Sequence, residues 1–492
     1  MNKLKVIVLS LTLLCFLRLS AEDYKASVFG IKSNGTTLNT TSIQKAIDYI
    51  HEKGGGQLVF YVGRYLTGTI HLKSNVKIRL EEGAILVGST NIYDYNINGP
   101  NCSLVSAFQA ENIAITGKGV IDGQGRELAY NLLDQVHKGI LPDELKNDRP
   151  ALRRPKGIYF RECKNVEISG IVVKNAAEWV LVFDQCQNLL IDRITVDSKA
   201  FWNNDGLDIV DCKDVKVTNS FIDAADDAIC FKSHDATKMC ENVEVRNCVA
   251  RSSANGIKFG TVTSGGYRNF KIIHNKVYDT YRSAITIATP DGGAIDNILV
   301  DSLFVYNTGN AIYLRIGARW NKGRMGSMSN ITIQNMYAEI SATKPDAGYE
   351  YEGPVEDLPR NTSPASIVGI PGQAITNVTL RNIQIIYPGG SNPNYAFRGI
   401  RPADLDSIPE MESAYPEFSQ FKELPAWGFY VRHAKNITFE NVTITAKAKD
   451  YRPAIVLHDV ERATLSGMKY NEPGGGKKQV HAYKSSGIIQ KK

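Results

Sequence analysis

Two short acidic motifs hold the residues of this sequence that are best suited to chemistry. The first is Asn203-Asn-Asp-Gly-Leu-Asp208, which carries Asp205, and the second contains the adjacent pair Asp226 and Asp227. Crowded carboxylates repel one another, so their pKa values separate and one can stay protonated near neutral pH. Glycoside hydrolysis needs this asymmetry, because one carboxyl group protonates the leaving oxygen while another activates water or attacks. The motifs suggest this chemistry if the fold brings them together.

The spacing of the two motifs is what favours a joint role. Taken singly, either motif is more typical of a turn cap or a calcium ligand. Asp205 and Asp226 lie 21 residues apart, however, which is close to one turn of the repeat described next. We therefore expect Asp205 to lie beside Asp226 and Asp227. Positions one coil apart allow a range of carboxylate distances, so the spacing leaves inverting and retaining hydrolysis both open.

A repeat with a period in the twenties supplies that spacing. Four cysteines open the same phrase, in which Asn or Asp stands two positions later and apolar residues then alternate: Cys163, Cys186, Cys212 and Cys240. The phrase recurs without cysteine around Asn112, Asn269, Asn297, Asn330, Asn377 and Asn436. Alternation is typical of strands, and a repeat of this length indicates a solenoid. We predict an all-β fold, a right-handed parallel β-helix in which the cysteines stack as small buried side chains.

A solenoid needs capped ends, and function usually resides in its loops. Residues 41–50 predict a short amphipathic helix that caps the N-terminal end, with Ile43, Ala46, Ile47 and Ile50 on one face. Three stretches interrupt the repeat, at about 122–156, 341–373 and 386–428. We expect these stretches to form loops on a rigid scaffold.

The N-terminal residues and the distribution of charge bear on export and on the class of partner. Lys3 and Lys5 precede an apolar run that is short for a membrane span, which predicts a signal peptide over 1–21, export to the periplasm or beyond, and no transmembrane segment. The net charge of +6 belongs mainly to this leader and to a basic C-terminal tail, 477–492. The remaining chain, 22–492, is read as one β-helix domain, with the cap and first coils over 22–100. Since its body is nearly neutral, we expect no nucleic-acid partner.

The chain resembles glycoside hydrolase family 28, the polygalacturonases and rhamnogalacturonan hydrolases. The motif at Asn203 matches the family's Asn-x-Asp, and Asp226-Asp227 matches its Asp pair. Further matches are Asn39-Thr-x-x-Ile-Gln, Tyr65-Leu-Thr-Gly-Thr and Asp122-Gly-Gln-Gly. The resemblance implies that Asp226 is the general acid, that Asp205 and Asp227 activate water with inversion, and that Asn203 supports the site. It implies neither a metal nor a cofactor.

The sequence departs from polygalacturonases where they recognise galacturonate. Asn255 replaces the histidine of the family's Gly-His-Gly, and Ile285-Thr-Ile287 stands in place of its Arg-Ile-Lys. Other residues could contact a uronate instead, because basic side chains pair with its carboxylate. The candidates for substrate binding, together with Asn203 and Asn255, are Lys232, Lys258, Arg282, Arg315, Arg401 and Arg432.

Three classes of function remain open at this point. The first is a secreted hydrolase of α-glycosidic bonds in pectic polymers, polygalacturonase-like and exo-acting, with a rhamnogalacturonan hydrolase as the alternative within the family. The second is a pectate lyase, which shares the fold but uses calcium and an arginine base. The third is a non-catalytic glycan-binding β-helix. The grouping of aspartates favours the first.

Overall fold

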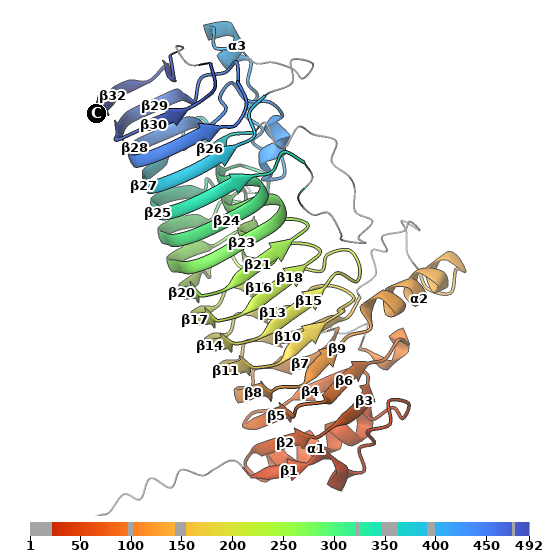
Figure 1. The fold of residues 1–492 in the computed structure, drawn as a ribbon. Helices are drawn as coiled ribbons and strands as arrows, with labels where there is room; N and C mark the ends of the chain where they lie inside the picture. The colour runs from red at the N-terminus through yellow and green to blue at the C-terminus, as the bar shows by residue number, and fades with distance from the viewer. Residues whose placement is uncertain are drawn as a thin grey trace, which may run out of the picture.

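The fold is a single stack of parallel coils, as Figure 1 shows for the computed structural model. The structure describes residues 22–96, 102–142, 154–320, 324–343, 345, 363–390, 399–474 and 478–491. The signal peptide predicted over 1–21 lies outside the described residues. No helix among the described residues is long and apolar enough to cross a membrane.

The strands follow one another along the stack from the N-terminal to the C-terminal end. The first coils contain β1 (Asp23–Lys25), β2 (Gly56–Phe60), β3 (Gly63–Thr67), β4 (Ile70–Leu72), β5 (Val76–Leu80), β6 (Ala84–Gly88), β7 (Ser103–Phe108), β8 (Glu111–Gly117) and β9 (Val120–Asp122). The middle coils contain β10 (Lys156–Arg161), β11 (Lys164–Ser169), β12 (Val172–Lys174), β13 (Leu181–Asp184), β14 (Gln187–Asp192), β15 (Thr195–Ser198), β16 (Leu207–Val210), β17 (Lys213–Thr218), β18 (Phe221–Ala224), β19 (Ile229–Ser233), β20 (Cys240–Arg246), β21 (Val249–Ser252) and β22 (Ile257–Thr263). The last coils contain β23 (Gly266–Thr289), β24 (Ala294–Ile316), β25 (Ser327–Ile340), β26 (Ala365–Val368), β27 (Ile375–Tyr387), β28 (Phe429–Ala446), β29 (Ile455–Ser466), β30 (Lys469–Asn471), β31 (Val480–Tyr483) and β32 (Ser486–Lys491).

Each middle coil consists of three strands that pair in parallel with the corresponding strands of the next coil. One face contains β10, β13, β16, β19 and β22 in order, and the second contains β11, β14, β17 and β20. The third face contains β12, β15, β18 and β21. The right-handed parallel β-helix predicted from the repeat is therefore confirmed.

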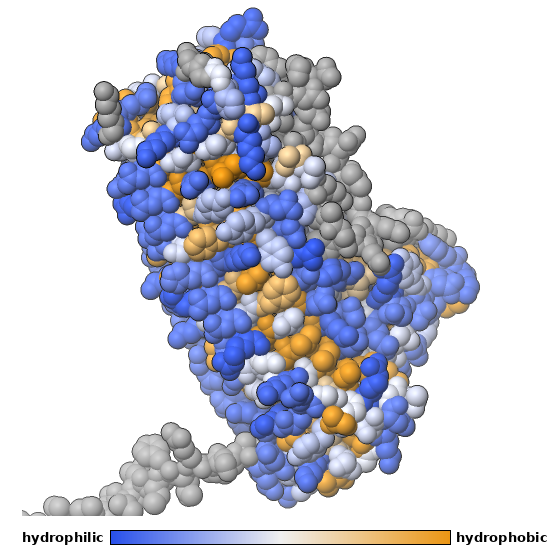
Figure 2. Space-filling view, in the orientation of Figure 1, coloured by the Kyte–Doolittle hydropathy of each residue, from blue (hydrophilic) through white to orange (hydrophobic). Residues whose placement is uncertain are grey.

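Alternating side chains of these strands fill the interior. The four cysteines that mark the repeat are fully buried free thiols, and burial is the main cause that raises the pKa of Cys212 and Cys240. Most of the visible outer face is hydrophilic, with hydrophobic residues interspersed along it (Figure 2). The apolar residues that alternate along the sequence are thus the ones that form the core.

The predicted capping helix is present as α1 (Thr40–Glu52), and its four expected apolar residues are buried against the first coils. Two more helices lie in the interrupting stretches: α2 (Gly125–His137) and the short α3 (Pro402–Asp406). The described residues also form the 3₁₀ turns η1 (Ala26–Phe29), η2 (Ile92–Asp94) and η4 (Phe418–Phe421). At the C-terminal end β31 and β32 pair with β29, so the described part of the basic segment 477–492 extends the last coil.

Candidate active site

The turn that precedes β16, β19 and β22 places polar side chains at the same point on successive coils. The backbone N–H of Gly206 donates to the carbonyl of Asp227 at 2.9 Å, and that of Ala228 donates to Asn255 at 2.9 Å. Asp205, Asp227 and Asn255 are therefore stacked. A Cβ at Gly206 would lie 2.4 Å from Ile222 Cγ2, so glycine lets the coils approach here.

Asn203 and Asn204 shape the turn that presents Asp205. Asn203 has a left-handed backbone with φ 58°, and its Oδ1 accepts a hydrogen bond from Arg154 Nη2 at 3.1 Å. Asn204 is fully buried, and its Nδ2 donates to the carbonyls of Ala176 and Glu178 at 2.9 Å each. Asn204 thus fixes the turn from inside, a role that the sequence did not indicate.

Lys232 lies at the centre of the buried charges. Its Nζ donates to Asp205 Oδ2 at 2.9 Å and to Asp208 Oδ1 at 2.5 Å, and it lies 2.9 Å from Cys230 Sγ. The ammonium also lies 4.6 Å from the centre of the Trp179 ring. We predicted that Lys232 binds substrate, but in the structure it pairs with two buried carboxylates and neutralises their charge. Asp208, inside the first motif, is a partner of Lys232 that was not predicted from the sequence.

The electrostatics of this group follow from burial and from the lysine. Burial raises the pKa of Asp205 well above its usual value, opposed by Lys232 and reinforced by the neighbouring aspartates. Burial likewise raises the pKa of Asp208 to about 6, again opposed by Lys232. Burial works against the charge of Lys232, but Asp205 and Asp208 outweigh it and hold the pKa of Lys232 well above its ordinary value. The lysine therefore remains an ammonium ion.

Asp227 is held as an anion by the next coil. It accepts a hydrogen bond from Lys258 Nζ at 2.7 Å and from Asn255 Nδ2 at 2.7 Å, while the Asn255 backbone donates at 3.1 Å. Burial acts to raise the pKa of Asp227, yet the ammonium groups of Lys258 and Lys232, with these hydrogen bonds, leave it below its usual value. Asn255 and Lys258, both predicted as substrate ligands, thus contact Asp227 directly.

Asp226 differs from its neighbour. Its side chain is only partly buried, and its Oδ1 accepts a hydrogen bond from the backbone N–H of Asp227 at 3.0 Å. Burial and then the charge of Asp227 raise the pKa of Asp226, with Arg282, Lys258 and Lys232 opposing them. Adjacent carboxyl groups with pKa values displaced in opposite directions can divide the roles of proton donor and base.

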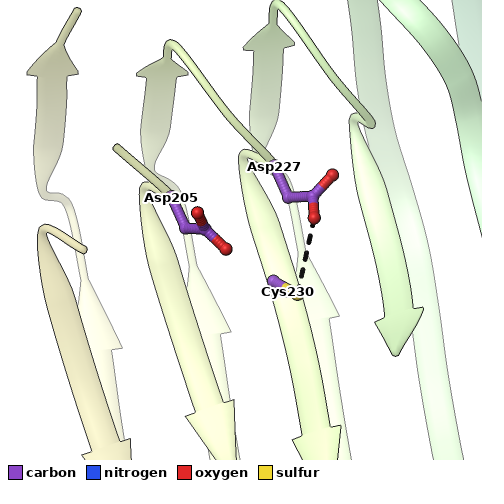
Figure 3. A group of neighbouring side chains, drawn as sticks. All are labelled: Asp205, Asp227 and Cys230. Atoms are coloured by element: carbon purple, nitrogen blue, oxygen red, sulfur yellow. Dashed lines mark hydrogen bonds between the residues drawn. The ribbon is translucent and has the colours of Figure 1, made fainter. Parts of the chain in front are cut away.

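One set of potential metal ligands lies within this cluster. Ligand atoms of Asp205, Asp227 and Cys230 lie within 4.8 Å of one another, and Figure 3 shows the two carboxylates on neighbouring coils with the thiol below them. Two of the three, Asp205 and Cys230, are within 2.9 Å of the Lys232 ammonium. Because that positive charge already lies among the ligands, they do not fit a divalent cation well.

Comparison with known proteins identifies the family. The model of glycosyl hydrolases family 28 matches residues 57–294, a span that contains all of these aspartates. The chain belongs to this family. An exo-poly-alpha-D-galacturonosidase of Dickeya chrysanthemi is 24% identical over 85% of this chain and 74% of its own length. The chain spans 61% of the length of two plant relatives.

Two solved structures of exopolygalacturonases have the same fold. A hyperthermoactive exopolygalacturonase from Thermotoga maritima is 23% identical, covers 74% of this chain and 87% of its own, and has a TM-score of 0.59. The family 28 exopolygalacturonase of Yersinia enterocolitica is 18% identical, covers 95% of this chain and 78% of its own, and has a TM-score of 0.60. Both likenesses support the parallel β-helix fold of this chain.

Three of the predicted arginines hold the segment 399–428 of this family 28 chain. Arg282 Nε forms an ion pair with buried Glu417 at 3.1 Å. Arg315, only 2% exposed, donates through Nη2 to the carbonyls of Glu410 and Met411 at 2.6 and 2.8 Å. Arg432, 4% exposed, donates to the carbonyl of Ile408 at 2.9 Å and pairs with the Glu410 carboxylate. The expectation that Arg315 and Arg432 bind substrate is corrected: both are buried and bond the protein.

Arg401 lies apart from the cluster. It precedes α3, has a side chain 83% exposed, and pairs with Asp404 at 2.8 Å. Arg401 was predicted to bind substrate, but it lies on the surface of the C-terminal segment. Tyr415, which was not predicted from the sequence, accepts a hydrogen bond from Lys258, and Arg319 lies beside its ring.

Proposed function

We propose that this enzyme hydrolyses α-glycosidic bonds in pectic polysaccharides or oligosaccharides with inversion at the anomeric carbon. The observation that carries the proposal is the pair Asp226–Asp227 beside Asp205, with the pKa of Asp226 raised and that of Asp227 lowered. The relatives, an exo-poly-alpha-D-galacturonosidase and two exopolygalacturonases, support a pectic substrate.

Each carboxyl group takes a role that suits its surroundings. Asp226, which is partly exposed and whose pKa burial raises, donates a proton to the leaving oxygen as the general acid. Asp227, held ionised by Lys258 and Asn255, accepts a proton from the attacking water as the general base, with Asp205 helping to orient that water. Lys232 and Asn204 position these groups without touching the sugar.

Exo action and export complete the proposal. The segment 399–428 is fastened to the scaffold through Arg282, Arg315 and Arg432. A segment held there would narrow one end of the site, which favours cleavage at a chain end. The leader over 1–21 favours export to the periplasm or the extracellular space. A rhamnogalacturonan hydrolase is the second candidate, because Asn255 and the missing Arg-Ile-Lys alter the place where polygalacturonases hold galacturonate.

The test compares wild type with Asp226→Asn on homogalacturonan and rhamnogalacturonan. We expect the variant to lose about 10²–10⁴-fold in kcat, the range for a general acid. The anomer of the first product is read by NMR, and product sizes separate exo from endo cleavage. An unsaturated, ultraviolet-absorbing product would instead identify a lyase, and full activity of Asp226→Asn would overturn the assignment of the acid.

A further inference from the structure

A continuous set of contacts leads from Asp227 out to the surface. Lys258 Nζ, which bonds Asp227 at 2.7 Å, also donates to Tyr415 Oη at 2.9 Å. Thr261 Oγ1 donates to the same hydroxyl oxygen at 2.7 Å. Tyr415 is 41% exposed, whereas Lys258 is 1% exposed. The Tyr415 ring therefore borders the open side of the site, and Lys258 lies between it and Asp227, the proposed base.

The position of Tyr415 is set by the contacts of the segment that carries it. Two residues later, Glu417 pairs with Arg282, and four residues earlier the carbonyl of Met411 accepts from Arg315. The Glu412 carbonyl also accepts the backbone N–H of Ala318 at 2.7 Å. Because these anchors lie on both sides of Tyr415, its ring is held in place before any ligand binds.

A cation and a second aromatic ring lie beside Tyr415. Arg319 bonds buried Asp291 through Nε and Nη2 at 3.1 and 3.0 Å. Its guanidinium carbon is 3.7 Å from the centre of the Trp320 ring and 5.9 Å from that of Tyr415. Trp320 is 63% exposed. A guanidinium has five N–H donors, and the two on Nη1 are not used by Asp291.

We propose that Tyr415, Arg319 and Trp320 form a subsite that binds an acidic sugar, a uronate, next to the cleaved bond. This inference rests on the proposed function and names the group that recognises its substrate. It assigns uronate recognition to residues outside the positions where polygalacturonases have Arg-Ile-Lys.

The chemistry of the three side chains fits such a ligand. The two exposed rings offer flat apolar faces against which the C–H face of a sugar ring can pack. The planar guanidinium, fixed by Asp291 and by stacking on Trp320, presents donors to a carboxylate oxygen. A neutral sugar would use the rings alone, so the arginine supplies the preference for the acid.

The test measures binding by calorimetry in an Asp226→Asn background, which separates binding from turnover. The ligands are trigalacturonate and its methyl ester, in which a methyl group on each carboxyl removes the charge. The parent should bind the free acid about tenfold more tightly than the ester. Tyr415→Ala and Trp320→Ala should each weaken both ligands by about tenfold, equivalent to about 1.4 kcal/mol.

Arg319→Lys separates charge recognition from stacking. Lysine still neutralises Asp291 but lacks the planar fork, so this variant should lose affinity for the free acid and keep its affinity for the ester. Tyr415→Phe keeps the ring and should bind nearly as the parent does. Tyr93→Ala, which removes an exposed tyrosine on an early coil, is the matched control and should change neither affinity.

The outcomes separate this inference from the proposed function. Equal affinity of the parent for acid and ester, or unchanged binding by Tyr415→Ala and Trp320→Ala, would overturn the subsite. If the parent shows the expected binding but wild type hydrolyses no pectic polymer, the subsite stands and the proposed function falls. Thermal midpoints of all variants confirm that each one is folded.

Discussion

Two stacks of side chains in this molecule obey opposite rules. On the outer turns, asparagines with left-handed backbone lie above one another, and each Nδ2 donates to the Oδ1 of the residue one coil earlier at 2.8–3.1 Å, as in the runs Asn75–Asn112–Asn165–Asn188 and Asp214–Asn242–Asn269–Asn297. At the active-site turn the stacked residues are Asp205, Asp227 and Asn255.

The two stacks differ in the hydrogen bonds that a side chain can form with the equivalent side chain of the next coil. A carboxamide is both donor and acceptor, so identical residues satisfy one another however long the run. A carboxylate only accepts, and two stacked carboxylates repel. The asparagine run therefore needs nothing else, whereas the aspartates require Lys232 and Lys258 from neighbouring strands. Repeated asparagines thus stabilise the scaffold, whereas the site forms where aspartates stack instead and need lysines as partners.

The most damaging way to test this contrast is Lys232→Met. Removing the ammonium leaves Asp205 and Asp208 buried without their partner, so we expect the free energy of unfolding to fall by about 3–5 kcal/mol and activity to be lost. Denaturant unfolding and kcat at 25 °C measure both effects. Lys216→Met, on an exposed position of β17, is the matched control and should change little. Wild-type stability for Lys232→Met would mean that the aspartates need no counter-charge.

The next comparison replaces one asparagine at the active-site turn and one in the outer run. Asn255→Ala removes a hydrogen bond that stabilises ionised Asp227, so the pKa of Asp227 should rise. Since the base must be ionised, activity on the acidic side is lost as pH falls through this pKa, and that limb of the pH–rate profile should move to higher pH. A charge-assisted hydrogen bond of about 1.5 kcal/mol corresponds to about one pKa unit, so the rate on the acidic limb should fall by about tenfold. An unmoved acidic limb would remove Asn255 from any role in setting the base.

Asn242→Ala applies the same change within the outer run. It removes the bonds to Asp214 and Asn269 and places alanine at φ 57°, so we expect a loss of about 1–2 kcal/mol in unfolding free energy. Asn242→Gly, which tolerates this backbone, should lose less. The kcat of both folded variants should equal that of wild type. A tenfold loss of kcat here would show that the scaffold and the site are not separable.

The scaffold was predictable because its signal is local and repeated. One coil of the sequence contains the whole pattern, so alternation and period sufficed for the β-helix, and the one-coil spacing brought Asp205 beside Asp227. Helix α2 had a signal that was missed within the stretch 122–156: its buried residues, Leu128, Leu132 and Val136 among them, recur at helical spacing.

The partners of the basic residues were not predictable, because they depend on where distant segments return. Tyr415 meets Lys258 across 157 positions of the chain, and Arg315 meets Met411 across 96. No periodicity links such pairs, so a buried arginine that anchors a loop looked the same as one that binds substrate. Asp208 was visible inside its motif, but its pairing with Lys232 required the register of β16 on β19.

Arg401→Ala should have the smallest effect of all, and it tests how far the site extends. Arg401 was a candidate from the sequence, yet its side chain is 83% exposed and pairs with Asp404 in the first turn of α3. An exposed ion pair of this kind adds little to stability, because water screens it. We expect KM to stay within about twofold of wild type and the thermal midpoint to be unchanged. Asp404→Ala, which removes the partner, is the matched control. A tenfold rise in KM for Arg401→Ala alone would show that the substrate-binding surface extends to α3. The outer scaffold and the site would then not be separate regions.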